Sequence, residues 1–181
     1  LLDGGAPIES RADTARSQSV TPVLAATQGK HVDVVRLLVA RGANVNAQDA
    51  QQDSAFLLAS ASGYTDIVQI TLAAGADLAS TNRYGGTALI PACHYGHVDT
   101  VRLLLTTRIA VDHINNLGWT ALLEAVILGD GGLAHAEIVR MLIAAKADVN
   151  LADAQGVTPL QHALARKQVH VAELLRAAGG R

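Results

Sequence analysis

Residues 87–92, TALIPA, and residues 98–112, VDTVRLLLTTRIAVD, decide the fold of this chain, because variants of the pair recur along it. Copies of the first segment begin at positions 21, 54, 87, 120 and 158, at spacings of 33, 33, 33 and 38 residues. They read TPVLAA, SAFLLA, TALIPA, TALLEA and TPLQHA. Self-similarity at a fixed period of this length predicts a repeat protein built from one small structural unit.

Each unit contains the signals of two short helices. A Thr or Ser opens the first segment, where its hydroxyl can accept from free backbone amides at a helix N-terminus. The second segment carries apolar residues at helical spacing, as in VDVVRLLVARGANVN at 32–46. Gly42, Gly75 and Gly179 follow that helix at one register position, where a left-handed conformation is common. We therefore predict an all-α chain of helix–turn–helix units.

These openings, the second segments and the 33-residue period resemble the ankyrin-repeat family over nearly all of the chain. The phrases NRYGGTALIPA and NLGWTALLEAVILGDG are similar to bacterial ankyrin-repeat proteins of undefined function. The resemblance implies an all-α repeat solenoid, in which stacked helix–turn–helix units are joined by β-hairpin-like loops. Because one unit cannot bury its apolar faces alone, neighbouring units must share a continuous core.

The register divides the chain into unequal parts. Residues 1–20 read as the end of a truncated repeat followed by a lengthened hairpin, with Gly5 in the register of Gly42. Because residue 1 is Leu, we expect the natural start to lie outside this sequence. The repeats are predicted at 21–53, 54–86, 87–119, 120–157 with a five-residue insertion, and 158–181 as a C-terminal cap.

Composition argues against several classes of protein. Half of the residues are apolar and the formal net charge is −2, without a block of Lys or Arg, so nucleic-acid binding is not expected. No apolar run approaches the roughly 18 residues that span a bilayer, which predicts no membrane insertion. The single Cys93 excludes an internal disulfide framework and a Cys-rich zinc site. We expect a soluble monomer, with the cytoplasm slightly favoured over export.

Three departures from the repeat pattern stand out. Arg108 and Lys146 occupy the register of the helix-ending glycines, so either they adopt positive φ or their helices end differently. The insertion, GDGGLAHAEIV at 129–139, predicts a solvated loop between two helices. Its Asp130, His135 and Glu137 match the spacing of no established metal site, so no metal is expected.

One register position is more informative than the others. The family's usual His after Thr-Pro-Leu is absent, and the next position, normally apolar, holds Ala25, Leu58, Pro91, Glu124 and His162. A core-facing carboxylate such as Glu124 must be hydrogen-bonded, protonated or directed to a ligand. We expect it to accept from backbone amides of a neighbouring hairpin or first helix, and a ligand role stays open. Pro91 removes a backbone donor one repeat earlier.

The resemblance also implies where partners dock, namely on the hairpin tips and the inner surface of the first helices. By register, the tip positions are Ala50, Gln51, Asp53, Arg83, Tyr84, Gly86, Asn116, Leu117, Trp119, Ala154, Gln155 and Val157. The inner helix positions are Gln28, Ala61, Ser62, His94, Tyr95, Ile127 and Leu128. Two of the three Tyr and the single Trp fall within this set, and aromatics are frequent interface anchors.

The prediction is a non-catalytic protein-interaction scaffold without a cofactor. A small-ligand or peptide pocket near Trp119, Glu124 and His94 is the alternative, and Trp119 and Tyr95 could instead pack between repeats. No nucleophile elbow, phosphate loop or zinc helix motif is present, although a Ser-His-Asp set assembled only in three dimensions stays open. The candidate partner-binding residues are Gln51, Asp53, Arg83, Tyr84, His94, Tyr95, Asn116, Leu117, Trp119 and Glu124.

Overall fold

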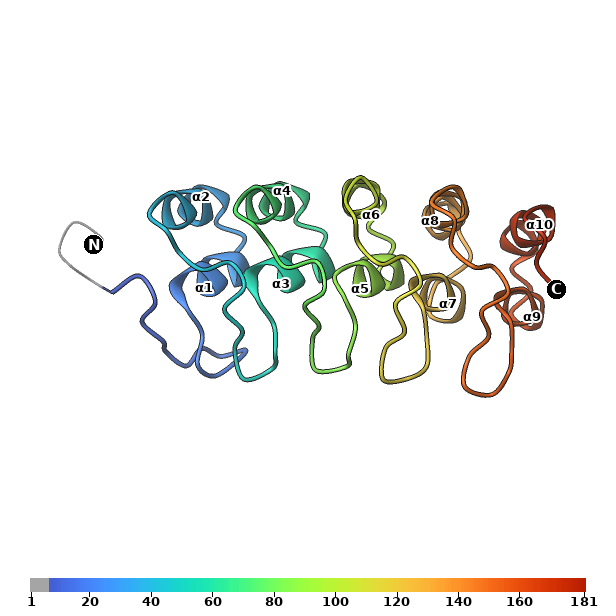
Figure 1. Cartoon of the computed structure of the whole chain (residues 1–181), viewed down its shortest axis with the longest axis horizontal. Helices are drawn as coiled ribbons and strands as arrows, with labels where there is room; N and C mark the ends of the chain where they lie inside the picture. The colour runs from blue at the N-terminus through green and yellow to red at the C-terminus, as the bar shows by residue number, and fades with distance from the viewer. Residues whose placement is uncertain (1–6) are drawn as a thin grey trace.

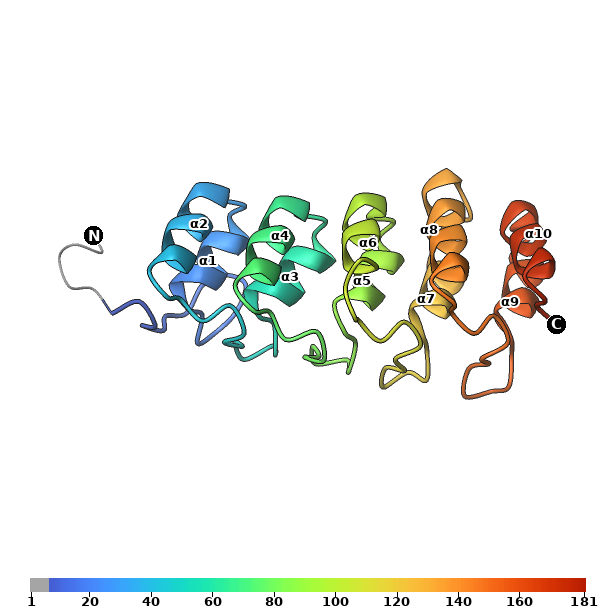
Figure 2. The same cartoon turned by 45° about the horizontal axis from the view of Figure 1, so that its top comes forward.

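The computed structural model describes residues 7–181, and in that range the chain forms ten helices and no strand. The helices are α1 Pro22–Gln28, α2 Val32–Ala40, α3 Ala55–Ala61, α4 Thr65–Ala73, α5 Leu89–His94, α6 Val98–Leu104, α7 Ala121–Ile127, α8 Leu133–Ala144, α9 Pro159–Ala165 and α10 Val169–Ala177. The odd-numbered helices form one row and the even-numbered helices a second, with loops projecting beside the odd-numbered row (Figure 1). Figure 2 shows the same two rows after rotation. The predicted all-α repeat solenoid is confirmed.

Hydroxyl side chains begin four of the five first helices, as predicted. Thr21, Ser54, Thr120 and Thr158 each accept a hydrogen bond from the backbone amide three residues later, at 3.2–3.4 Å. At Thr158 the Gln161 side chain also accepts from the Thr158 amide, which completes a capping box. The sequence pattern therefore located these helix N-termini correctly.

Thr87 is the exception, and Pro91 gives the reason. In the other units, the residue four places after the cap donates its amide to the cap carbonyl, as Glu124 does to Thr120 at 2.9 Å. Pro91 has no amide proton, so Ile90 donates to the Thr87 carbonyl instead, at 3.2 Å. The Thr87 hydroxyl is buried and has no hydrogen-bond partner among the described residues, and α5 begins only at Leu89.

The helix-ending register shows both outcomes that the sequence allowed. Gly42, Gly75 and Gly179 have φ of 89°, 83° and 90°, and Lys146 accepts the same left-handed region at 69°. Arg108 avoids it. Its helix α6 ends early, at Leu104, and the chain continues through turns in which amides bond carbonyls three residues back. A non-glycine residue is thus accommodated in two different ways at one position.

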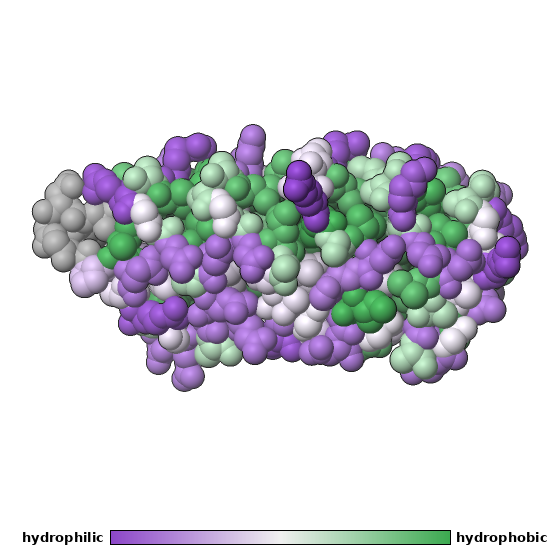
Figure 3. Space-filling view, in the orientation of Figure 1, coloured by the Kyte–Doolittle hydropathy of each residue, from purple (hydrophilic) through white to green (hydrophobic). Residues whose placement is uncertain are grey.

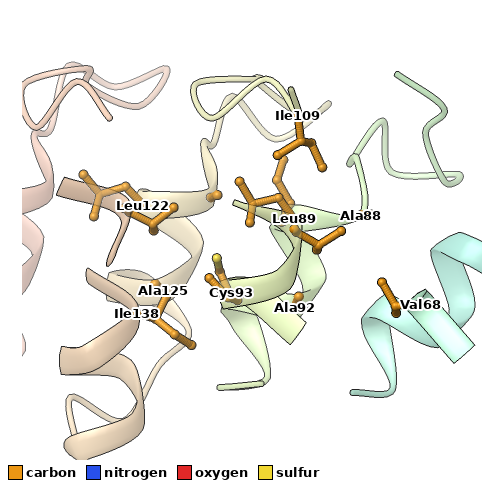
Figure 4. Close-up of a cluster of buried hydrophobic side chains, with 14 of the residues drawn as sticks. Val68, Ala88, Leu89, Ala92, Cys93, Ile109, Leu122, Ala125 and Ile138 are labelled. Atoms are coloured by element: carbon orange, nitrogen blue, oxygen red, sulfur yellow. The ribbon is translucent and has the colours of Figure 1, made fainter. Parts of the chain in front are cut away.

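The core runs continuously through the stack. One cluster of buried apolar side chains extends from Val23 in α1 to Leu175 in α10. Figure 4 shows part of it, where Cys93 on α5 lies among residues of α5, α7 and α8. Leu89, Leu104 and Leu175 are all fully buried. Neighbouring units therefore supply the interior that each lacks, as expected for a solenoid.

The insertion is only partly a loop. Helix α8 has 12 residues, against nine in α2, α4 and α10, because three residues before the usual helix start form an extra turn. The prediction of a solvated loop is therefore wrong for residues 133–135 and holds only for the preceding connection. Ordering the inserted residues as helix satisfies their backbone hydrogen bonds internally.

The described part of the N-terminal segment folds back on itself before α1. Ala12 and Val20 pair as an isolated antiparallel bridge, and Arg11 donates to the Gln48 carbonyl of the next hairpin at 2.8 Å. Gly5 lies outside the described residues. Over residues 7–181, no helix combines the length and apolar character needed to cross a membrane.

Candidate functional site

The hairpin tips are built by one side chain that recurs at the repeat period. Asp49, Asn82, Asn115 and Asp153 each accept two backbone amides on Oδ1, from the residues two and four places later, at 2.9–3.1 Å. This is the turn that Asp and Asn side chains favour. The sequence analysis missed these residues, although an Asp or Asn at spacings of 33, 33 and 38 was a visible signal.

Neighbouring tips are tied together on the side of the first helices. The Asn116 amide donates to the Tyr84 carbonyl at 2.9 Å, and His113 Nε2 donates to the Gly85 carbonyl at 2.7 Å. These two bonds fix the hairpin before α5 against the hairpin before α7. The surface between the two tips is therefore held by one backbone–backbone bond and one bond from a part-buried histidine ring.

A pocket of about 250 Å³ lies between these two hairpins and helices α5 and α7. Both tips and both helices contribute to its walls. Its lining residues are Asn82, Tyr84, Gly86, Ile90, Pro91, His94, Tyr95, Asn115, Leu117 and Glu124. The structure thus brings five of the predicted site residues together, namely Tyr84, His94, Tyr95, Leu117 and Glu124.

Glu124 is the buried carboxylate of this pocket, with 5% of its surface exposed. Asn115 Nδ2 donates to its Oε1 at 2.9 Å, whereas His94 Nδ1 lies 3.5 Å from its Oε2. Burial raises the pKa of Glu124, and the Asn115 hydrogen bond partly offsets that rise. Oε1 of Glu124 therefore accepts from a side-chain amide of its own preceding hairpin, and not from the backbone amides that the sequence suggested.

Two neighbours of Glu124 on α5 titrate abnormally. Burial lowers the pKa of His94, and the nearby His135 lowers it further, so the imidazole is neutral at pH 7. The His94 ring stacks on Tyr95, with centroids 4.2 Å apart. Burial, with a smaller contribution from Glu124, raises the pKa of Cys93, so its thiol is unreactive. Neither group supplies a positive charge beside the carboxylate.

Two register positions on the hairpins and first helices carry exposed large apolar side chains in the middle repeats and not in the flanking ones. Tyr84 and Leu117 occupy one tip position and are 54% and 52% exposed; Tyr95 and Leu128 occupy the end of the first helix and are 59% and 42% exposed. We call these four residues the central apolar patch. Elsewhere in the row the same positions hold Gln51, Gln155, Gly29, Ser62 and Arg166. Figure 3 shows one face, where hydrophilic residues cover most of the hairpin side.

Family models for ankyrin repeats match residues 1–82, 56–153 and 133–176. The chain belongs to the ankyrin-repeat family. An ankyrin repeat domain from Acinetobacter baumannii is 48% identical over 99% of this chain and 90% of that one, with a TM-score of 0.93. An Enterococcus ankyrin-repeat protein is 33% identical over 97% and 87%, with a TM-score of 0.88.

No curated protein matches the chain. Ankyrin repeats are in general protein–protein interaction modules without catalytic activity. Membership of the family therefore indicates an interaction module in general. Any specificity of this chain must come from the residues that differ between its repeats.

The remaining predicted residues of this ankyrin chain lie outside the pocket. Trp119 is half-buried and does not line it. Arg83 is exposed, lies over the Tyr84 ring at 4.8 Å and donates to the Tyr84 hydroxyl at 3.1 Å. Asn116 is exposed on its tip. Glu124 and His94 thus line the pocket, whereas Trp119, which the alternative prediction grouped with them, does not.

The first ankyrin tip is occupied by internal contacts. The Ser17 hydroxyl donates to the Gln51 side chain, which ties that tip to the N-terminal hairpin. Burial raises the pKa of Asp53, and Asp49 raises it further, while Arg83 acts in the opposite direction. Gln51 and Asp53 therefore lie outside the pocket and carry structural contacts.

The insertion in the fourth ankyrin repeat contacts the end of α5, which forms one wall of the pocket. His135 Nε2 donates to the His94 carbonyl at 2.9 Å, and its Nδ1 lies 2.8 Å from Asp130 Oδ1. Glu137 pairs instead with Arg140 and, at 3.8 Å, with Arg102. Within residues 7–181, no three His, Cys, Asp or Glu side chains gather as a metal site requires.

Proposed function

We propose that the protein is a non-catalytic scaffold that binds a protein partner through its hairpin tips and the inner face of its first helices. The central apolar patch is the main contact. The observation that supports this most is the confinement of Tyr84, Tyr95, Leu117 and Leu128 to three consecutive repeats, at positions that carry no apolar side chain in the rest of the row. Exposed aromatic and aliphatic groups gathered at one place favour an interaction surface.

The rigid backing of the patch also supports the proposal. Two neighbouring tips are joined by the Asn116 and His113 hydrogen bonds, and the end of α5 is held by His135. A partner that docks here does not need to order the surface first. Binding therefore costs less conformational entropy than docking on a mobile loop.

The pocket beside the patch is small for a metabolite site. Its volume of about 250 Å³ lies below the roughly 300–1,000 Å³ of typical small-molecule pockets. It is the right scale for one side chain that projects from a larger partner. For this reason we favour a protein partner over the small-ligand alternative.

The first experiment identifies the partner by its contact point. A photo-crosslinking amino acid at Tyr95 is expected to capture one protein in cells of the source organism. The same amino acid at Asp99, exposed at the start of α6 in the outer helix row, should not capture it. Mass spectrometry of the two crosslinked samples reports the difference.

The second experiment measures affinity with the purified partner. Tyr84→Ala, Tyr95→Ala, Leu117→Ala and Leu128→Ala are each expected to weaken binding, and the strongest by at least about tenfold. Gln155→Ala and Arg166→Ala alter exposed residues at the same two register positions and should change the dissociation constant by less than about twofold. Equal losses at patch and control positions would refute the proposed contact surface.

A further inference from the structure

The pocket between α5 and α7 holds one carboxylate and no balancing cation. Of its lining residues, four side chains can ionise: Tyr84, His94, Tyr95 and Glu124. A tyrosine side chain carries no positive charge in either protonation state, so neither ring can balance a carboxylate. His94 is neutral, since burial and the nearby His135 lower its pKa. The charge of an ionised Glu124 is therefore uncompensated inside the pocket.

One oxygen of Glu124 is available to a ligand. Oε1 accepts from Asn115 Nδ2 at 2.9 Å, and this bond fixes the orientation of the carboxylate. Oε2 accepts no hydrogen bond from the described residues, and its basic neighbour, His94 Nδ1, is 3.5 Å away, beyond hydrogen-bonding range. An incoming donor at Oε2 would supply the second partner that a buried carboxylate needs.

The walls of the pocket suit the stem of a long side chain. Ile90 and Pro91 supply aliphatic surface, while the rings of Tyr84 and Tyr95 stand at more than half exposure at its rim. Lys and Arg pack their methylene stems on apolar surface and carry a cationic head. Tyrosine faces also attract such cations.

The basic residue nearest the rim does not fill this role. Arg83 is exposed, does not line the pocket and lies over the Tyr84 ring. On the adjacent tip, Asp49 and Asp53 stand close enough to Arg83 for their charges to interact. Arg83 is therefore balanced outside the pocket, and Glu124 is left without a cation.

We propose that this pocket receives one lysine or arginine side chain of an extended partner segment, with its cationic end on Glu124 Oε2 and its stem between Pro91 and the tyrosines. This inference rests on the proposed function, because it names the chemistry of the segment that docks on the central apolar patch. The partner's basic residue supplies the charge and the hydrogen-bond donor that the pocket lacks.

The test begins with a phage-displayed library of random dodecapeptides selected against the immobilised full chain. Enriched peptides are synthesised, and their dissociation constants are measured by fluorescence polarisation. Each is compared with a copy in which the basic residue is replaced by a neutral isostere, citrulline for Arg or norleucine for Lys. These two arms also show which of the two side chains the pocket prefers.

The decisive comparison is a double-substitution cycle with Glu124→Gln. For the unmodified chain, the neutral peptide should bind at least about tenfold more weakly than the basic peptide, as expected for loss of a partly buried charge pair. For Glu124→Gln the two peptides should differ by less than about twofold. Glu137→Gln, which removes a carboxylate from α8, should behave like the unmodified chain. Thermal unfolding of each variant verifies folding.

The possible outcomes separate this inference from the proposed function. A library that yields no binder, or binders without a shared basic residue, overturns the inference. An equal effect of citrulline or norleucine on the unmodified chain and on Glu124→Gln overturns it as well. If the natural partner still depends on Tyr84 and Tyr95 in either case, the proposed function stands. If basic peptides depend on Glu124 while the partner ignores the patch, the proposed contact surface fails instead.

Discussion

Helices α7 and α9 are each joined to their preceding hairpin by a side-chain hydrogen bond, but the donor and the acceptor are exchanged between the two pairs. Before α7, Asn115 on the hairpin donates to Glu124 on the helix at 2.9 Å; before α9, His162 on the helix donates to Asp153 on the hairpin at 2.7 Å. The two pairs occupy identical register positions. The repeat thus determines where a hairpin–helix side-chain bond forms, and the residues decide which partner carries the charge.

The number of donors explains why the two carboxylates titrate in opposite directions. Asp153 accepts from the Val157 amide, from His162 and from the Gln155 amide, and these bonds lower its pKa despite its burial. Glu124 accepts one hydrogen bond, from Asn115, so burial dominates and raises its pKa. A buried carboxylate with few donors is costly, and such costs are typical of binding sites rather than of structural braces.

The largest expected effect is that of Asn115→Asp. This nearly isosteric change keeps the acceptor for the two tip amides but replaces the donor to Glu124 by a second carboxylate. We expect a loss of about 3 kcal/mol in the free energy of unfolding at pH 7, because two like charges meet in a buried place. Urea unfolding at pH 7 and at pH 4 measures it, and the loss should shrink at the lower pH, where one carboxyl binds a proton.

A second-site change gives the control for that variant. Asn115→Asp combined with Glu124→His copies the Asp153–His162 pair into the earlier repeat. It should recover most of the loss, about 2 kcal/mol, since the two changes restore a donor–acceptor pair. If the double variant is no more stable than Asn115→Asp alone, the Asn115–Glu124 and Asp153–His162 positions are not structurally equivalent.

Glu124→Gln is expected to stabilise the chain by about 1 kcal/mol at pH 7, because it removes a buried charge and keeps an acceptor for Asn115. The pKa of Glu124 is raised above its ordinary value of 4.5, so ionisation costs more in the folded state. The unmodified chain therefore loses stability relative to the variant as pH rises from below 4.5 through the folded pKa. Urea unfolding between pH 3.5 and 8 reports this, and a pH-independent difference would contradict it.

Pro91→Ala extends the comparison to α5, which presents Pro91 where α7 presents Glu124. The new amide can donate to the Thr87 carbonyl and release the Ile90 amide to donate to the Thr87 hydroxyl, as the Leu123 amide does to Thr120. We expect a gain of about 0.5 kcal/mol, since the added bonds exceed the entropy gained by the unfolded chain. Thermal unfolding measures it, with Ala25→Pro, at the same register in α1, as the reverse control. A lower stability for Pro91→Ala would show that α5 depends on proline packing.

Asp153→Asn has the smallest expected effect, and its pH dependence has the opposite sign to that of Glu124→Gln. The pKa of Asp153 is lowered below its ordinary value of 3.8, so its ionised form stabilises the fold above that pH. This stability is lost as pH falls through the folded pKa. The variant should be slightly less stable than the unmodified chain at pH 7 and equal to it near pH 2. An unchanged difference at pH 2 would contradict the assignment.

Sequence reasoning predicted much of the fold and part of the site. The caps at Thr21 and Thr158 followed from local patterns, because their hydrogen bonds join residues three apart. The same reasoning grouped Trp119 with Glu124 and His94 around a pocket that Trp119 does not line, since register does not say which way a half-buried ring packs. It also left open how Arg108 and Lys146 end their helices, which depends on the turns that follow.

The sequence by itself determined the helix pairs, their order and the apolar core that neighbouring repeats share. These features follow from hydrogen bonds within a unit and from apolar periodicity, both of which are local. Only the tertiary structure decided that Asn115 meets Glu124 and that Tyr84, Tyr95 and Leu117 surround one pocket. Those contacts join different hairpins and helices, so they depend on how each hairpin folds back over its helix. That orientation is set by bonds between neighbouring tips, such as the Asn116 amide to the Tyr84 carbonyl.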